Sequence, residues 1–237
     1  MPEIVLVNTQ IPENLGAVAR AMLNFKLRKL RVVSPLFDLS NEKIIPLSAG
    51  ADSIIKNTKK FDLFEDSIKD FNILIAITNR VRSIKKKQIN FEKLNEIVFN
   101  SSNKVGMIFG PEKSGLKNDH VSMCDYALKI NSNPKFPSLN LSHAVSLVAY
   151  EIMQGESLKK KLNIEKLIDS QATKKELINF FDLLEGDLEE KGFFSIKERK
   201  RILKQKIRNI FNKLDLTSRD VSTLLGIIRC LGKNNQK

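Results

Sequence analysis

Short apolar runs rich in β-branched residues alternate with longer helical patterns through the first two thirds of the chain, and this alternation limits the possible folds. Strands that alternate with helices indicate β-α-β units, which form a parallel sheet. The predicted strands are Ile4–Val7, Leu30–Val33, Ile73–Ile77, Val105–Phe109 and Ala127–Ile130. The predicted helices are Leu15–Phe25, Asp62–Lys69, Phe91–Phe99 and Leu141–Met153. We therefore expect an α/β fold with a mainly parallel sheet.

Each predicted strand is followed by polar, proline or glycine residues. In an open α/β sheet, ligands bind among the loops that leave the carboxyl ends of the strands. The sequence therefore predicts a binding site formed by these strand-end segments: Asn8-Thr9-Gln10, Ser34-Pro35, Thr78-Asn79-Arg80, Gly110-Pro111 and Asn131-Ser132-Asn133-Pro134.

After about residue 154 the strand patterns stop, and three helical patterns with start signals follow. Thr173-Lys174-Lys175-Glu176 and Ser195-Ile196-Lys197-Glu198 have capping-box spacing, in which a hydroxyl and a carboxylate bond to free backbone N–H groups. Thr217-Ser218-Arg219-Asp220 is a weaker version. We predict an α/β domain, a linker and a small all-helical extension over residues 1–156, 157–172 and 173–237.

The chain contains 40 Lys and Arg against 27 Asp and Glu, a formal net charge of +13 that indicates a polyanionic partner. Residues 157–237 carry much of this excess, with 19 basic and 11 acidic residues. One predicted helix carries the cations that we expect to contact phosphates: Lys197, Arg199, Lys200, Arg201, Lys204 and Arg208. The alternative is that this run of charge is an ordinary solvated helix face.

Several other classes of site are disfavoured. Two cysteines and two histidines are too few and too scattered for a disulfide framework or a zinc site, so we expect a reducing cytoplasm and no metal. No signal peptide is expected at the N-terminus, and the longest uncharged run, residues 136–150, is too short to span a membrane. Gly110 and Gly115 have phosphate-loop spacing, but Leu116 and Lys117 follow where that motif requires Lys and Ser or Thr.

Three polar, glycine-bearing segments remain, namely Asn14–Arg20, Phe109–Leu116 and Pro137–Ser142. In this order and at these intervals they resemble the signature motifs of the SpoU (TrmH-type) branch of the SPOUT RNA methyltransferases, over residues 2–155. Further segments are similar to the TrmJ group of tRNA ribose 2'-O-methyltransferases, whose members add a C-terminal helical extension. Those segments are Ile4–Thr9, Leu47–Ala51, Ser138–Leu141 and the helical Lys174–Cys230.

The resemblance implies a sheet whose C-terminal part is threaded into a trefoil knot, a homodimer, and S-adenosylmethionine as cofactor. The knot loops of the family bind this cofactor. By residue-to-residue carry-over, the expected cofactor-binding residues are Ile77, Thr78, Asn79, Gly110, Ile130, Pro137, Ser138, Leu139 and Asn140.

The resemblance also implies that Arg20 is catalytic and contacts RNA. A guanidinium stays protonated, so we expect Arg20 to hold a phosphate and the developing oxyanion while the proton leaves to Ser138, water or phosphate. Asn14 fixes its loop or bonds the ribose, and it also has the residue type of a helix N-cap. Glu112 accepts backbone N–H bonds or orients Arg20 through a salt bridge. Asn140 ties the knot loop and caps the last helix.

The expected function is 2'-O-methylation of a tRNA ribose, at nucleotide 32 of the anticodon loop, with the helical extension binding RNA. The same reaction on ribosomal RNA is the alternative within the enzyme class. From another class, the chain could be a non-catalytic RNA-binding module on this fold, although Arg20 and the intact Gly110–Gly115 loop argue against it.

Overall fold

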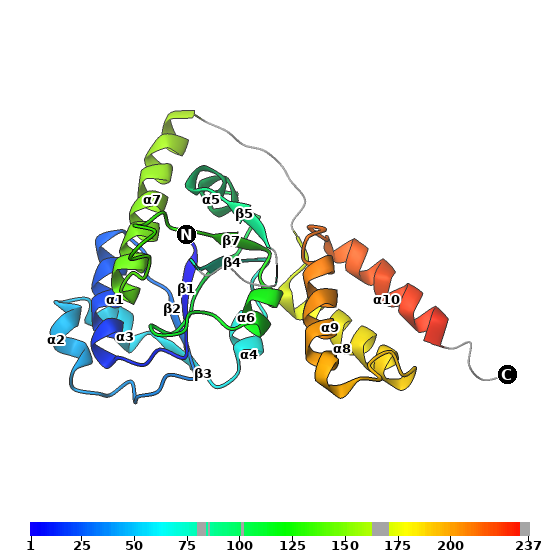
Figure 1. Cartoon of the computed structure of the whole chain (residues 1–237). Coiled ribbons are helices and arrows are strands. Elements are labelled where there is room, and N and C mark those ends of the chain that lie inside the picture. The colour runs from blue at the N-terminus through cyan, green and yellow to red at the C-terminus, as the bar shows by residue number, and fades with distance from the viewer. Residues whose placement is uncertain (80–83, 85, 101, 163–170, 233–237) are drawn as a thin grey trace.

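The computed structural model describes residues 1–79, 84, 86–100, 102–162 and 171–232, and its strands there form one seven-stranded, all-parallel sheet (Figure 1). The α/β prediction is confirmed; the trefoil knot stays a prediction. The order across the sheet is β3-β2-β1-β6-β4-β7-β5. The strands are β1 (Glu3–Val7), β2 (Leu30–Val33), β3 (Lys59–Phe61), β4 (Ile73–Ile77), β5 (Lys87–Ile89), β6 (Val105–Phe109) and β7 (Tyr126–Leu128).

The two strands that the sequence did not indicate are β3 and β5, which form the two edges of the sheet. Each has three residues, and the first two of each are exposed and polar, Lys59-Lys60 and Lys87-Gln88. Short edge strands with charged side chains resist pairing with other chains. They lack the apolar run by which the central strands were found.

Helices cover both faces of the sheet. Before the C-terminal helices they are α1 (Pro12–Asn24), α2 (Ile44–Ser48), α3 (Asp52–Lys56), α4 (Phe64–Ile68), α5 (Phe91–Val98), α6 (Asn118–Met123) and α7 (Leu141–Leu162). Successive side chains of a strand point to opposite faces. Accordingly, Ile4 and Leu6 of β1 join the apolar core with α1, α2, α3, α5 and α7, whereas Val5 and Val7 join a second core with α4 and α6.

The remaining helices are α8 (Lys174–Glu190), α9 (Lys197–Phe211) and α10 (Ser218–Gly232). The capping box at Thr173 and Glu176 is confirmed. Thr217 and Asp220 also exchange both bonds of a capping box at the start of α10. The predicted box at Ser195 and Glu198 is wrong: Ile196 is the N-cap of α9 and supplies no side-chain bond.

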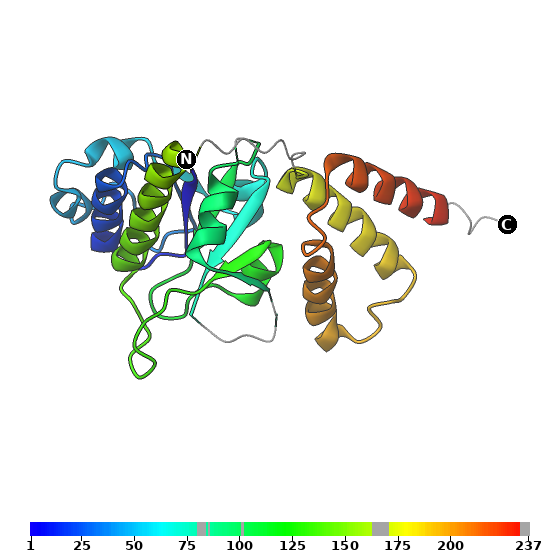
Figure 2. The same cartoon turned by 90° about the horizontal axis from the view of Figure 1, so that it is seen from above.

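The C-terminal helices share the second core with the sheet (Figures 1 and 2). Leu177, Phe180 and Phe181 of α8 are buried in the same cluster as β1. The Lys174 ammonium is fully buried and lies 2.6 Å from Asp125, whose other oxygen accepts a bond from a β4 backbone N–H. This arrangement ties α8 directly to the sheet. Of the predicted linker, residues 163–170 lie outside the described residues, and α7 extends to Leu162.

Because the core is shared, a chain that ends after Leu162 is expected not to fold cooperatively. It loses the part of the apolar cover of one sheet face that α8 and α10 supply, and it leaves the Asp125 carboxylate without its buried cation. Breaking such a pair costs about 3–5 kcal/mol. Thermal unfolding followed by circular dichroism checks this, together with binding of a dye specific for exposed apolar surface. A chain that ends after Gly232 is the control and should melt like the full chain. A cooperative, dye-free transition in the shorter chain would contradict the expectation.

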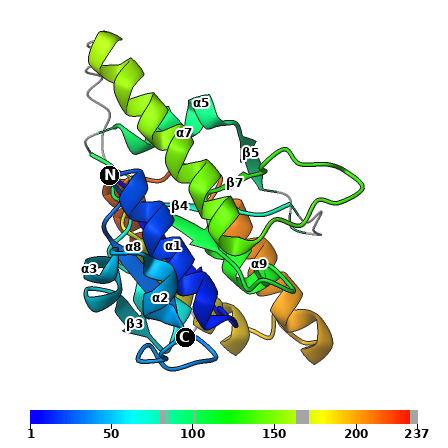
Figure 3. The same ribbon diagram turned by 90° about the vertical axis from the view of Figure 1, so that its left-hand side faces the viewer.

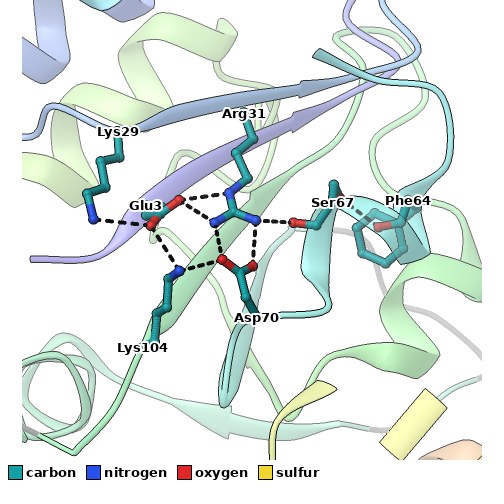
Figure 4. Close-up of polar contacts among 7 residues, drawn as sticks. All are labelled: Glu3, Lys29, Arg31, Phe64, Ser67, Asp70 and Lys104. Carbon is teal, nitrogen blue, oxygen red and sulfur yellow. Dashed lines mark hydrogen bonds and ion pairs between the residues drawn. The ribbon is translucent and has the colours of Figure 1, made fainter. Parts of the chain in front are cut away.

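A buried ion network lies at the amino ends of the strands (Figure 4). Arg31 of β2 is 3% exposed, and its guanidinium donates four hydrogen bonds of 2.6–2.9 Å: one to Glu3, two to Asp70 and one to the Ser67 carbonyl. Its Nη2 also lies 2.7 Å from the Glu3 carboxylate. The guanidinium carbon Cζ of Arg31 lies 4.3 Å from the centre of the Phe71 ring. These hydrogen bonds from Arg31 hold the pKa of the Asp70 carboxyl below its ordinary value. The network therefore joins β1 and β2 to the segment before β4.

Candidate active site

A pocket of about 330 Å³ lies at the carboxyl ends of β4, β6 and β7, and the ion network lies at the opposite, amino ends of the strands. Eight of the nine predicted cofactor-binding residues line it: Ile77, Thr78, Asn79, Gly110, Ile130, Pro137, Ser138 and Leu139. Asn140 does not line it. The pocket also takes in side chains that the prediction lacked, namely Phe109, Pro111, Glu112, Lys113, Ser114, Leu141 and Ala144. Most of these extra residues follow β6 or lie at the start of α7. They are neighbours in the sequence of predicted site residues, and this proximity could have indicated them.

The loop after β6 folds back on itself so tightly that its glycines are required. The Gly115 N–H donates to the Pro111 carbonyl oxygen at 2.8 Å, and Gly115 has a φ of +61°, which side chains rarely adopt. A Cβ on Gly110 would lie 2.2 Å from the backbone nitrogen of Leu116. This segment therefore keeps a fixed shape along one side of the pocket.

The variant Gly110→Ala is expected to lose cofactor binding, because the added carbon displaces backbone rather than a flexible side chain. Calorimetric titration with S-adenosylmethionine measures the change, and we expect at least a tenfold weaker affinity. Gly186→Ala is the matched control, since a Cβ there meets nothing within 4 Å. Equal affinities in the two variants would contradict the role given to this loop.

The opposite side of the pocket is formed by the segment between β7 and α7, and Asn79 fixes this segment by two hydrogen bonds. The Asn79 amide donates to the Pro137 carbonyl at 2.9 Å and to the Ser132 hydroxyl at 3.2 Å. The Ser132 hydroxyl also donates to the Pro137 carbonyl at 3.1 Å. One predicted cofactor residue thus positions another.

Hydrogen bonds bring the three motif segments together beside the pocket. The Asn14 amide donates to Glu112 at 2.8 Å, and the Asn140 amide donates to the Asn14 carbonyl oxygen at 2.9 Å. Glu112 also accepts from the Thr9 hydroxyl at 3.1 Å and from the Gln10 backbone N–H at 3.0 Å. These bonds join segments that lie 98 and 126 residues apart in the chain.

The geometry decides between several expected roles. The N-cap interpretation of Asn14 is wrong, because Ile11 is the N-cap of α1 and Asn14 lies inside the helix. The cap formed by Asn140 is confirmed, since its oxygen accepts from the Ser142 backbone N–H at 2.8 Å. Glu112 accepts the expected backbone bond. Within the described part of the chain, however, no ion pair joins Glu112 to Arg20.

Arg20 is exposed on α1 and does not line the pocket of its own chain. It lies one turn before Leu23, so both project from the same face of α1. Helix α7 packs beside α1, and Figure 3 shows the two helices side by side on the face toward the viewer. Leu147 and Tyr150 of α7 are 43% and 44% exposed, and Leu23 of α1 is 36% exposed. The two adjacent helices thus expose three large apolar side chains to solvent.

Four of the predicted RNA-contacting cations of α9 are ion-paired with acids from other helices. Lys200 pairs with Glu189 and Arg201 with Asp119, while Lys204 and Arg208 lie 3.0 Å and 2.6 Å from the buried Glu185. Arg199 is exposed. The same cations, with Asp119 and Gln205, line a cavity of about 450 Å³ between α9 and α6. The helix is therefore less cationic in the fold than its sequence indicates.

The described residues provide neither a cluster of metal ligands nor a helix that could cross a membrane. No group of three or more His, Cys, Asp or Glu side chains lies close enough together there to hold a metal ion. In the same residues, no helix combines the length and the apolar character that crossing a membrane requires.

A parallel sheet with a pocket at the carboxyl ends of its strands is the arrangement of an α/β ligand-binding enzyme. Residues 1–150 match the family described as SpoU rRNA Methylase, and the chain belongs to this family. The resemblance drawn from the three motif segments is thereby confirmed.

The relatives extend over the C-terminal helices as well. An uncharacterized tRNA/rRNA methyltransferase of Haemophilus influenzae is 31% identical over 97% of this chain and 94% of its own length. The tRNA (cytidine-2'-O-)-methyltransferase TrmJ of Methanocaldococcus jannaschii is 28% identical over 97% of this chain and 99% of its own length. The crystal structure of TrmJ from Z. mobilis ZM4 superimposes with a TM-score of 0.90 at 32% identity, covering 98% of this chain and 100% of that one.

Proposed function

We propose that this protein transfers a methyl group from S-adenosylmethionine to the 2'-hydroxyl of a tRNA ribose, at nucleotide 32 of the anticodon loop. The observation that carries the proposal is the pocket at the carboxyl ends of the strands. Beside it, hydrogen bonds among Asn14, Glu112 and Asn140 join the three motif segments. The similarity to TrmJ proteins along the whole chain supports tRNA as the substrate.

The residues of the pocket suit this cofactor. Ile77, Ile130 and Leu139 supply apolar walls, and the ends of three parallel strands present backbone N–H and C=O groups suited to the edges of adenine and ribose. Glu112 is engaged with Thr9, Gln10 and Asn14 and shapes the pocket. When bound, S-adenosylmethionine supplies an electrophilic methyl group.

The acceptor needs more help from the protein, because a ribose hydroxyl is a weak nucleophile. In our proposal Arg20 holds the neighbouring phosphate and stabilises the negative charge that develops on the ribose oxygen. The hydroxyl proton leaves to water or to the phosphate, directly or through Ser138, which accepts it while passing its own proton on. Ser138 lies in the pocket wall and is exposed, so its hydroxyl is accessible to the acceptor.

Arg20 reaches a pocket through a homodimer in this proposal. Its own chain's pocket does not include it, and the face that carries it also exposes Leu23, Leu147 and Tyr150. A twofold dimer that buries this face removes apolar surface from water and brings Arg20 toward the partner's pocket. The site is then complete only in the dimer.

The tRNA body is held in part by α9 and the cavity beside it. Arg199 supports this role because it is exposed, and the paired cations Lys200 and Arg201 lie at exposed or half-exposed positions open to phosphate. A phosphate that approaches this cavity competes with Asp119 for Arg201. A tRNA substrate is also consistent with a cytoplasmic location.

The test is transfer of labelled methyl from S-adenosylmethionine to unmodified tRNA and to ribosomal RNA. We expect label in tRNA only, and mass spectrometry of nuclease digests should place it on nucleotide 32. Label in ribosomal RNA alone would favour the alternative substrate. No transfer to either RNA, without cofactor binding, would favour the non-catalytic module.

A further inference from the structure

The segment between β7 and α7 projects from the body of the molecule beside the pocket (Figures 2 and 3) and carries Phe136. Phe136 is 77% exposed, more than any other large apolar residue in the described part of the chain. A single exposed apolar residue is common on protein surfaces and means little by itself. Here the next two residues, Pro137 and Ser138, line the pocket, so Phe136 directly precedes the pocket wall in the chain.

Hydrogen bonds hold the ring in a defined turn. The Phe136 backbone N–H donates to the Asn133 carbonyl at 2.9 Å, and the Lys135 N–H donates to the Asn133 side-chain oxygen at 3.0 Å. Asn79 holds the Pro137 carbonyl on the other side. Proline at positions 134 and 137 restricts the backbone further. The backbone that carries the ring therefore has less conformational entropy to lose on binding than an unconstrained loop.

The surroundings of the ring are cationic. Its loop carries exposed Lys129 and Lys135 and no acid, and the facing loop after β6 carries exposed Lys113 and Lys117. The one acid of these two loops, Glu112, directs both carboxylate oxygens to Thr9, Gln10 and Asn14. An exposed aromatic ring among lysines matches a nucleic acid, whose bases stack on rings and whose phosphates pair with ammonium groups. An apolar protein surface would leave these lysines unpaired.

We propose that Phe136 is a stacking platform for an unpaired nucleobase of the RNA substrate and positions the adjoining ribose at the pocket. This inference rests on the proposed function and deepens it by assigning a residue that recognises the unpaired nucleotide of the substrate loop. Bases inside a duplex are stacked on one another and do not present a free face to a protein ring. Phe136 is a positioning residue, because it touches a base and not the reacting atoms.

The first experiment compares Phe136→Ala with the wild type. Removal of one base-stacking aromatic is expected to lower kcat/KM for tRNA roughly 5- to 150-fold. The affinity for S-adenosylmethionine should not change, and neither should the melting temperature, because the ring is exposed. Phe193→Ala, a change at a 52% exposed phenylalanine between α8 and α9, is the matched control and should leave kcat/KM unchanged.

The second experiment detects the stack directly. The chain has no tryptophan, so Phe136→Trp introduces a single tryptophan that can be excited apart from the two tyrosines and keeps an aromatic face. We expect this variant to retain most of its activity and to lose fluorescence when tRNA is added. Phe193→Trp should respond less. An unchanged fluorescence of Phe136→Trp at a saturating concentration of tRNA would overturn the inference.

The two proposals fail separately. If the wild type transfers no methyl to tRNA, the proposed function is wrong whatever Phe136 does. If the wild type transfers methyl and Phe136→Ala transfers it with the same kcat/KM, only the stacking role is wrong. Equal methylation of a duplex and of a loop carrying the same nucleotide would also overturn the stacking role.

Discussion

Arg20→Ala is expected to lower the rate of methyl transfer by about 10²–10³-fold or more, the loss typical of removing a donor that stabilises a developing oxyanion. Single-turnover transfer to tRNA at saturating cofactor measures it. Affinity for S-adenosylmethionine should be preserved, because in the proposed mechanism Arg20 contacts the RNA phosphate and the acceptor oxygen and not the cofactor. Arg20→Lys should recover only part of the rate, since an ammonium lacks the planar fork that binds phosphate through two bonds. Arg28→Ala, a change at an exposed arginine beyond the end of α1, is the control.

The dimer in this prediction is testable by mixing two inactive variants. Arg20→Ala keeps an intact pocket, whereas Gly110→Ala keeps Arg20. If Arg20 serves the partner's pocket, random exchange of subunits restores about a quarter of the wild-type activity, because half of the twofold dimers then contain one complete site. No recovery after proven subunit exchange would show that Arg20 acts within its own chain. Equal collapse of cofactor affinity in Arg20→Ala would also contradict the role proposed for it.

Arg31→Met is expected to lower the free energy of unfolding by about 3–5 kcal/mol, the usual cost of removing one partner from a buried ion pair. Glu3 stays 5% exposed and loses both of its contacts with the guanidinium, and the Ser67 carbonyl loses its donor. Urea titration measures the change. Lys29→Met is the matched control on the same network: Lys29 is exposed and 3.6 Å from Glu3, and such surface pairs contribute about 1 kcal/mol or less. Equal losses in the two variants would contradict the importance of burial here.

The same network predicts a dependence on pH. The pKa of Asp70 is lower in the folded chain than its ordinary value of 3.8, so below about pH 4 the unfolded chain binds a proton that the folded chain does not. The Arg31–Asp70 contribution is therefore complete above about pH 5 and is lost as pH falls through 3.8 toward the folded pKa. Arg31→Met should flatten this part of the stability curve. An unchanged curve between pH 5 and pH 2 would contradict the assignment.

Local patterns were sufficient for much of the fold. Ile73–Ile77 and Val105–Phe109 were predicted with the bounds that the structure has, because central parallel strands are apolar throughout. The capping box at Thr173 was also predicted correctly, since it depends on residues three apart. The edge strands β3 and β5 were missed because exposed three-residue strands lack such a pattern. The three motif segments found by resemblance contain eleven of the sixteen residues that line the pocket.

The sequence by itself determined where buried segments lie, which residues carry the family motifs and where the basic residues concentrate. The tertiary structure decided which segments become neighbours: β7 lies between β4 and β5, Lys174 is buried against Asp125, and Glu185 pairs with cations of α9. The physical reason is that periodicity and capping act over a few residues and record whether a side chain is buried. The partner of a buried charge is chosen by packing between segments far apart in the chain, and no local pattern carries that information.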